Sequence, residues 1–182
     1  SGIIYLAEPL SKSAVEQLRG YRRPLVIARA CLPPGIAVRE VGAPVVGVDN
    51  IGGARSAASL LLQLGHRRIG LLLGPPTSRD AAERKAGYLE VLERGGVAPR
   101  PQWIFEGTFN TEGGRNGMNA MLKLENRPTA YCCANDEIAF GAIDAARAAG
   151  LECPRDFSVV GFDDGMWATA SRPSLTTVRQ PL

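Results

Sequence analysis

The chain has 182 residues, of which 45% are hydrophobic and 21% are charged, and its formal net charge is +3. This length holds one ordinary domain or two small ones, and the balance of apolar and charged residues excludes a disordered chain. The apolar runs are strand-sized, which excludes a membrane-spanning helix. The small net charge, without a basic stripe, argues against a surface that grips DNA by itself.

The few cysteines and the single histidine limit which kinds of chemical site the chain can form. The four cysteines, at positions 31, 132, 133 and 153, show no Cys-x-x-Cys spacing, and His66 is the single histidine. The sequence therefore offers almost none of the cysteines and histidines that a zinc site, a disulfide framework or a catalytic triad requires. We expect reduced thiols, no metal, no cofactor and no catalytic residue. No secretory leader is visible, so the expected location is cytoplasmic.

The first quarter of the chain predicts short strands around one helix. A strand is expected over 3–6, and a helix over 11–20 that begins at a serine and ends near a glycine. Strands over 24–28 and 44–48 follow, separated by a loop over 31–43 that is rich in proline and glycine.

From Asp49 onwards, helices and strands alternate regularly. In chain order, the patterns predict a helix over 49–65, a strand over 68–73, a helix over 80–94, a strand over 103–107, a helix over 111–124, a strand over 129–133, a helix over 136–149, and strands over 157–162 and 175–178. Continuous apolar strands that are each followed by a helix favour a parallel sheet covered on both faces. An excess of basic residues ends before Gly65, which suggests two parts, 1–64 and 65–182.

Polar and aromatic residues gather where the predicted strands end. Ligands of open parallel sheets bind beyond the carboxyl ends of the strands. The residues found there are Thr77, Ser78, Arg79, Asp80, Arg84, Phe109, Asn110, Asn135, Asp136, Asp163 and Asp164. Carboxylates accept hydrogen bonds from hydroxyls, an arginine donates with a fork, and a ring covers the apolar face of a sugar. The set therefore suits a polyhydroxylated ligand.

Each of these residues also has a purely structural interpretation. Asn135 and Asp136 stand where a helix needs a cap, Asp163 and Asp164 where a turn is expected, Arg84 on a helix with charged neighbours, and Phe109 where a core ring fits. The residues alone leave these alternatives open. No Gly-x-Gly-x-x-Gly motif, phosphate-binding loop or Gly-x-Ser-x-Gly elbow is present, so nothing names an enzyme.

Five blocks of sequence together form a recognisable pattern. The blocks are Val48-Asp49-Asn50 with Gly52-Gly53-Ala54 and Leu64-Gly65-His66-Arg67-Arg68-Ile69, Gly74-Pro75 with Arg84-Lys85-Ala86-Gly87-Tyr88, Asn135-Asp136-Glu137-Ile138-Ala139-Phe140-Gly141, Ser158-Val159-Val160-Gly161-Phe162-Asp163-Asp164, and Pro173-Ser174-Leu175-Thr176-Thr177-Val178-Arg179-Gln180. In this order and spacing, the blocks resemble the effector-binding core of the LacI/GalR family of bacterial transcription regulators, and they cover nearly the whole chain.

The resemblance implies an α/β, parallel-sheet fold like that of periplasmic binding proteins, with two similar three-layer α/β/α subdomains. The first subdomain is expected to be incomplete in 1–64, and 65–182 is expected to form the second up to the crossover. The family's helix-turn-helix and hinge helix are absent from the sequence, so the chain resembles a fragment of such a regulator.

The resemblance also assigns roles to particular residues. By position in the family's motifs, Arg84, Asp163, Asn135, Phe109 and Asp80 are expected to bind the effector. The implied function is that of a ligand-sensing domain, which binds a sugar or sugar-like metabolite in a cleft between subdomains. Binding would then modulate the grip on operator DNA of the absent helix-turn-helix.

Two alternatives remain at this stage, a periplasmic sugar-binding protein of a transport system and an α/β enzyme acting on a sugar or nucleotide. The resemblance further implies a homodimer. The helix expected over 136–149 has a second apolar set, Phe140 and Ile143, on a side other than its main stripe. We expect these two residues at a dimer interface.

Overall fold

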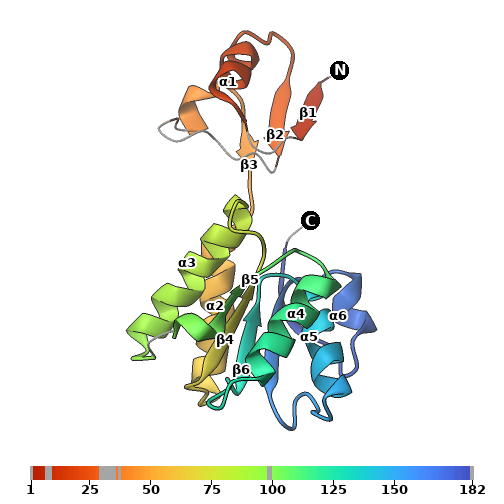
Figure 1. Cartoon of the computed structure of the whole chain (residues 1–182). Helices are drawn as coiled ribbons and strands as arrows, with labels where there is room; N and C mark the ends of the chain where they lie inside the picture. Colours follow the sequence, from red (N-terminus) through yellow and green to blue (C-terminus); the bar gives the residue numbers. More distant parts are fainter. Residues whose placement is uncertain (1, 7–9, 29–35, 37, 98–99, 181–182) are drawn as a thin grey trace. The chain divides into compact units, whose positions relative to one another are not determined.

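The computed structural model describes residues 2–6, 10–28, 36, 38–97 and 100–180 (Figure 1). Cys31 lies outside the described residues. The chain divides into two compact units, 1–49 and 50–182. Within the described residues, no helix is long and apolar enough to cross a membrane.

The described residues of the first unit form a small parallel sheet with one α-helix. Its elements are β1 (Ile3–Leu6), α1 (Lys12–Arg19), β2 (Leu25–Ala28), a 3-10 turn (Val38–Glu40) and β3 (Val45–Val46), and the strand order is β1-β2-β3. The hydroxyl of Ser11 accepts a hydrogen bond from the Ala14 amide and so caps α1, as the sequence pattern predicts. Four buried residues form the core, Leu10, Val15, Ile27 and Val41.

The second unit contains a five-stranded parallel sheet in the order β5-β4-β6-β7-β8. In chain order its elements are α2 (Asn50–Gln63), β4 (Ile69–Leu73), α3 (Arg79–Arg94), a 3-10 turn (Pro101–Trp103), β5 (Ile104–Glu106), α4 (Thr111–Leu122), β6 (Ala130–Cys133), α5 (Asp136–Ala148), β7 (Ser158–Asp163), α6 (Met166–Ala170) and β8 (Thr176–Arg179). The α/β fold with parallel sheets is therefore confirmed. The short helix α6 was not expected, because five residues are too few to show a helical period.

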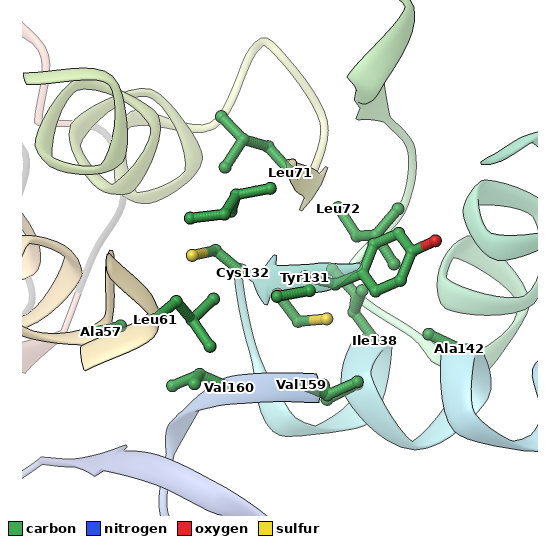
Figure 2. Packing of buried hydrophobic residues seen from close by; sticks show 14 of the residues in the cluster. Ala57, Leu61, Leu71, Leu72, Tyr131, Cys132, Ile138, Ala142, Val159 and Val160 are labelled. Atoms are coloured by element: carbon green, nitrogen blue, oxygen red, sulfur yellow. The ribbon is translucent and has the colours of Figure 1, made fainter. Parts of the chain in front are cut away.

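Helices cover both faces of this sheet, with α2 and α3 on one side and α4 and α5 on the other (Figure 1). The central strands β4 and β6 are buried along their whole length, as strands covered on both faces must be. Figure 2 shows Leu61 of α2 on the side of Cys132, and Ile138 of α5 on the side of Tyr131. Adjacent residues of β6 thus fill different layers of one core.

Glycine allows α4 and α5 to pack closely. A Cβ atom on Gly114 would overlap the carbonyl oxygen of Ile138, and one on Gly141 would overlap that of Thr111. Because the two helices meet through their backbones here, neither position accepts a side chain without moving a helix. The packing fixes the start of α5, which borders the polar edge of the sheet.

The boundary between the two units differs from the one expected near Gly65. The structure groups α2 with the second unit, so the division falls between Asp49 and Asn50. The reason is packing, because α2 buries Ala54, Ala58 and Leu61 in the large core and contacts β6, β7 and β8. The charge imbalance that suggested Gly65 is a surface property and does not report such contacts.

Candidate functional site

The carboxyl-end edge of the second unit's sheet brings together side chains from three parts of the chain. Arg84 projects from α3, Ala134 and Asn135 follow β6, and Asp163 ends β7. All strands of this sheet run parallel, so their carboxyl ends share one edge, as the sequence analysis expects.

Arg84 is built into the sheet edge and is only 4% exposed. Its guanidinium carbon lies 3.9 Å from the centre of the Phe162 ring, a cation–π contact. Its Nε donates to Asn50 Oδ1 at 2.8 Å, Nη1 donates to the Ala134 carbonyl, and Nη1 lies 3.4 Å from Asp163 Oδ1. The interpretation of Arg84 as a solvated helix arginine is therefore wrong.

Asn50 is a residue of this edge that no sequence pattern indicated. It is 3% exposed, and its Nδ2 donates to Asp80 Oδ1 at 2.8 Å and to Glu83 Oε2 at 2.9 Å. Its oxygen accepts from Arg84, so one neutral amide separates a guanidinium from two carboxylates. The orientation of the amide follows from chemistry, because a guanidinium only donates and a carboxylate only accepts. No local pattern signals this role, which depends on α2 lying beside α3.

Asp80 and Asn135 are placed at this edge but are committed to local contacts. Asp80 is half-buried and receives the amide of Asn50. Asn135 is the N-cap of α5, and its side-chain oxygen accepts from the Ile138 amide at 2.8 Å. The cap expected at Asn135 or Asp136 is therefore Asn135.

Asp163 presents a carboxylate to solvent at the end of β7, with 37% of its side chain exposed. Gln180 Nε2 donates to its Oδ1, the oxygen that faces Arg84. The next residue, Asp164, is paired with Arg179 on β8. Asp163 is thus the more open member of the Arg84–Asp163 pair.

Asp136 is a buried carboxylate beneath the turn that follows Asp163. It is 2% exposed, its Oδ2 accepts from the Gly165 amide at 2.8 Å, and its Oδ1 accepts from the Thr177 hydroxyl. Burial is the main cause that raises the pKa of Asp136, and the nearby carboxylates of Asp163 and Asp164 raise it further. The two hydrogen bonds oppose this rise.

Phe109 lies at the end of β4, against Gly74. The ring occupies the space that a Cβ atom on Gly74 would need. Phe109 is half-buried and packs against the large core. Asn110 next to it caps α4 through a hydrogen bond from the Gly113 amide at 2.9 Å.

Two ion pairs hold the charged side chains at the carboxyl ends of β7 and β8. Arg84 pairs with Asp163, and Arg179 pairs with Asp164. Buried charges need partners, and a further anion or cation placed here would disturb one of these pairs. Within the described residues, no group of three or more His, Cys, Asp or Glu side chains is placed to hold a metal ion. The arrangement suits a neutral ligand with several hydroxyls.

The two residues expected at a dimer interface differ in their surroundings. Ile143 is 5% exposed and belongs to the large core, so its expected place on an uncovered face is wrong. The periodicity of α5 alone does not show that this position packs into the core. Phe140 is half-buried, with its ring centre 4.8 Å from that of Trp167 on α6.

Comparison with known proteins places the chain in a family. The periplasmic binding protein-like domain matches residues 58–182. The transcriptional repressor CytR of Escherichia coli K12 is 34% identical over 180 residues, which cover 99% of this chain and 51% of that protein. The transcriptional regulator GalS of Salmonella typhimurium is 40% identical over 149 residues, covering 82% of this chain and 42% of GalS.

Solved structures agree with these relatives. A regulatory protein of the LacI family from Chloroflexus aggregans superposes with a TM-score of 0.87 at 32% identity, over 99% of this chain and 63% of that one. The regulator CelR in complex with cellobiose superposes with a TM-score of 0.82 at 31% identity, over 99% of this chain and 54% of that one. The chain spans about half the length of the curated relatives named above.

Proposed function

The chain belongs to the periplasmic binding protein-like domains of LacI-type transcriptional regulators, and from this premise we propose that it senses a neutral, sugar-like effector. The effector binds at the carboxyl-end edge formed by Arg84, Asn135 and Asp163, with Phe109 and Asp80 at the sides. Its binding alters the affinity of the longer regulator for operator DNA. The chemistry of this edge is recognition, and no residue of it acts as a nucleophile.

The pairing of Arg84 with Asp163 is the observation that carries this proposal. The buried guanidinium is held in one orientation by Asn50, Ala134 and Phe162, while the carboxylate is open to solvent. A vicinal diol can donate to Asp163 and accept from an arginine nitrogen beside it. Because the pair is already neutral, a hydroxyl ligand adds hydrogen bonds without adding an unpaired charge.

The carboxylates of this edge also favour a neutral ligand over an anionic one. A sugar phosphate or sugar acid would bring negative charge close to Asp163, Asp164 and the buried Asp136. Repulsion between these carboxylates and an anionic ligand opposes binding, and Arg84 already has a carboxylate partner. The cellobiose bound by CelR is a neutral sugar, which makes it a reasonable first probe.

The proposed control of DNA binding is a population shift. An effector that binds one arrangement of the regulator more tightly than another shifts the equilibrium by the ratio of the two affinities. Operator binding belongs to a helix-turn-helix outside these 182 residues, since this chain has little net charge for contacting phosphates. The proposed location is cytoplasmic, where operator DNA lies.

We also propose a homodimer that uses the α5–α6 surface, defined as Phe140, Met166 and Trp167. Met166 is 76% exposed, and Phe140 and Trp167 are half-buried beside each other. Adjacent exposed apolar side chains favour contact with another protein surface. A second copy of the chain presents the same surface, as a two-fold interface requires.

A thermal-shift panel tests the effector proposal. The probes are cellobiose and D-glucose as neutral sugars, and D-gluconate and D-glucose 6-phosphate as anionic ones. We expect a neutral sugar to raise the unfolding temperature in a concentration-dependent manner, because a ligand that binds only the folded state stabilises it. A larger shift with either anion, or none with any neutral sugar, contradicts the proposal.

A further inference from the structure

We propose that Asp136 is a positioning residue, whose buried carboxylate holds the turn that presents Asp163 to the effector. The role assigned to Asp163 rests on the proposed function, but the hold on the turn does not. Asp136 itself is 2% exposed and is expected to act through Asp163 without touching a ligand.

Two chains of hydrogen bonds connect Asp136 to this turn. Oδ2 accepts directly from the Gly165 amide at 2.8 Å. Oδ1 accepts from the Thr177 hydroxyl, whose oxygen in turn accepts from the Asp164 amide at 3.4 Å. A single carboxylate thereby fixes both residues that follow Asp163, one directly and one through Thr177.

The backbone of the turn explains why it needs to be held. Asp163 has φ +115° and Asp164 has φ +57°, both in the region that favours glycine. Residues with a Cβ keep such angles only where surrounding contacts determine them. Without its acceptors, the turn has more favourable conformations available, and each of them moves the Asp163 carboxylate relative to Arg84.

The structure makes room for a carboxylate at this place and partly compensates its burial. Gly161 on β7 leaves the space that Asp136 Oδ1 occupies, since a Cβ atom there would overlap this oxygen. Asp136 is also the first residue of α5, where the amino end of a helix favours negative charge. Only an ionised carboxylate offers an acceptor oxygen to both donors, while an amide offers one.

The test compares Asp136→Asn with Glu137→Gln, a matched change at the next, half-buried position of α5. Amide hydrogen exchange measured by NMR reports the turn, and the side-chain signals of Arg84 report its contact with Asp163. In Asp136→Asn we expect the Asp164 and Gly165 amides to exchange about tenfold or more faster, because a charge-assisted hydrogen bond is lost. The Arg84 signals should shift, and amides elsewhere in residues 50–182 should keep their parental rates.

Thr177→Val serves as a second variant, since it removes the intermediate hydroxyl and leaves the carboxylate in place. It should release the Asp164 amide and shift the Arg84 signals in the same direction, while Glu137→Gln should change neither. Parental exchange at Asp164 and Gly165 in both variants overturns the inference. Uniformly faster exchange throughout residues 50–182 also overturns it, because that result indicates a general loss of stability.

The same experiment separates the inference from the proposed function. If cellobiose or D-glucose binds the parent, we expect Asp136→Asn to weaken that binding by about tenfold or more, because Asp163 is displaced. If neither binds, the proposed function is contradicted, and the exchange rates with the Arg84 signals still decide whether Asp136 holds the turn.

Discussion

Arg84 Nη1 and Asp163 Oδ1 lie 3.4 Å apart, the first on a buried side chain and the second on one that is 37% exposed. Because of this unequal burial, the two side chains have different roles. The arginine is fixed by Asn50, Ala134 and Phe162, so it orients the carboxylate from below. The carboxylate is left as the group that a ligand meets.

Arg84→Lys is expected to destabilise the chain. Lysine keeps the charge but has no Nε–H group, so the buried oxygen of Asn50 loses its donor. We expect the free energy of unfolding to fall by about 1–3 kcal/mol, measured by urea denaturation. The matched control is Arg115→Lys, an exposed partner of Asp144, for which about 0.5 kcal/mol or less is expected. Equal losses in the two variants contradict this account of Arg84.

The cysteines of β6 are expected to be inert in the folded chain. Cys132 and Cys133 are fully buried between the helices, as Figure 2 shows for Cys132, and burial raises the pKa of both thiols. Cys153 is half-buried and provides an internal comparison. In a Cys31→Ser background, iodoacetamide labelling mapped by mass spectrometry should reach Cys153 about tenfold or more faster. If Cys132 or Cys133 were labelled at a rate comparable to that of Cys153, this expectation would be contradicted and the thiol would be reactive.

The pKa of Asp136 predicts a dependence of stability on pH. Burial raises this pKa above its usual 3.8, so the folded chain holds the proton more tightly than the unfolded chain. The bound proton therefore stabilises the folded chain. This stabilisation is complete below the pKa of Asp136 in the unfolded chain and is lost as pH rises through its pKa in the folded chain. Unfolding free energies of the parent and Asp136→Asn, compared at about pH 3.5 and pH 7, should show the parent losing stability relative to the variant. A constant difference would show that Asp136 titrates normally.

Phe140→Glu is expected to convert dimers into monomers. The substitution places a charge beside Trp167 and Met166 on the α5–α6 surface, where a second copy is proposed to pack. Sedimentation velocity measures the change, and the unfolding temperature shows whether the variant remains folded. A folded variant that sediments as the parental dimer excludes this surface as the interface.

The sequence predicted the alternation of strands and helices and the polar residues at the strand ends, because hydrophobic period and strand-end position are local signals. Alternating apolar strands and helices gave the parallel α/β architecture, and the strand-end rule gave Arg84 and Asp163 as neighbours. The ring nitrogens of His66, the single histidine, each lie 3.0 Å from a hydroxyl, those of Thr129 and Ser158, so this side chain connects parts of the fold.

What the sequence did not predict depends on contacts between distant elements. Asn50 became important only because α2 lies beside α3, and Asp136 only because α5 begins beneath β7 and β8. Ile143 was expected on an open face because the period of α5 alone does not show which other elements bury that face. A periodic pattern describes one element at a time and does not contain these relationships.

Calorimetry of cellobiose and D-glucose binding to the parent and to Asp163→Asn tests the central claim most directly. Asparagine replaces one acceptor oxygen with a donor, so a bound hydroxyl loses its partner. We predict that a neutral sugar binds the parent and that Asp163→Asn weakens this binding by about tenfold or more. The control Asp144→Asn, an exposed carboxylate that pairs with Arg115 away from this edge, should stay within about twofold of the parent. Binding to Asp163→Asn that is within about twofold of the parent, or no neutral sugar bound by the parent, would contradict the account.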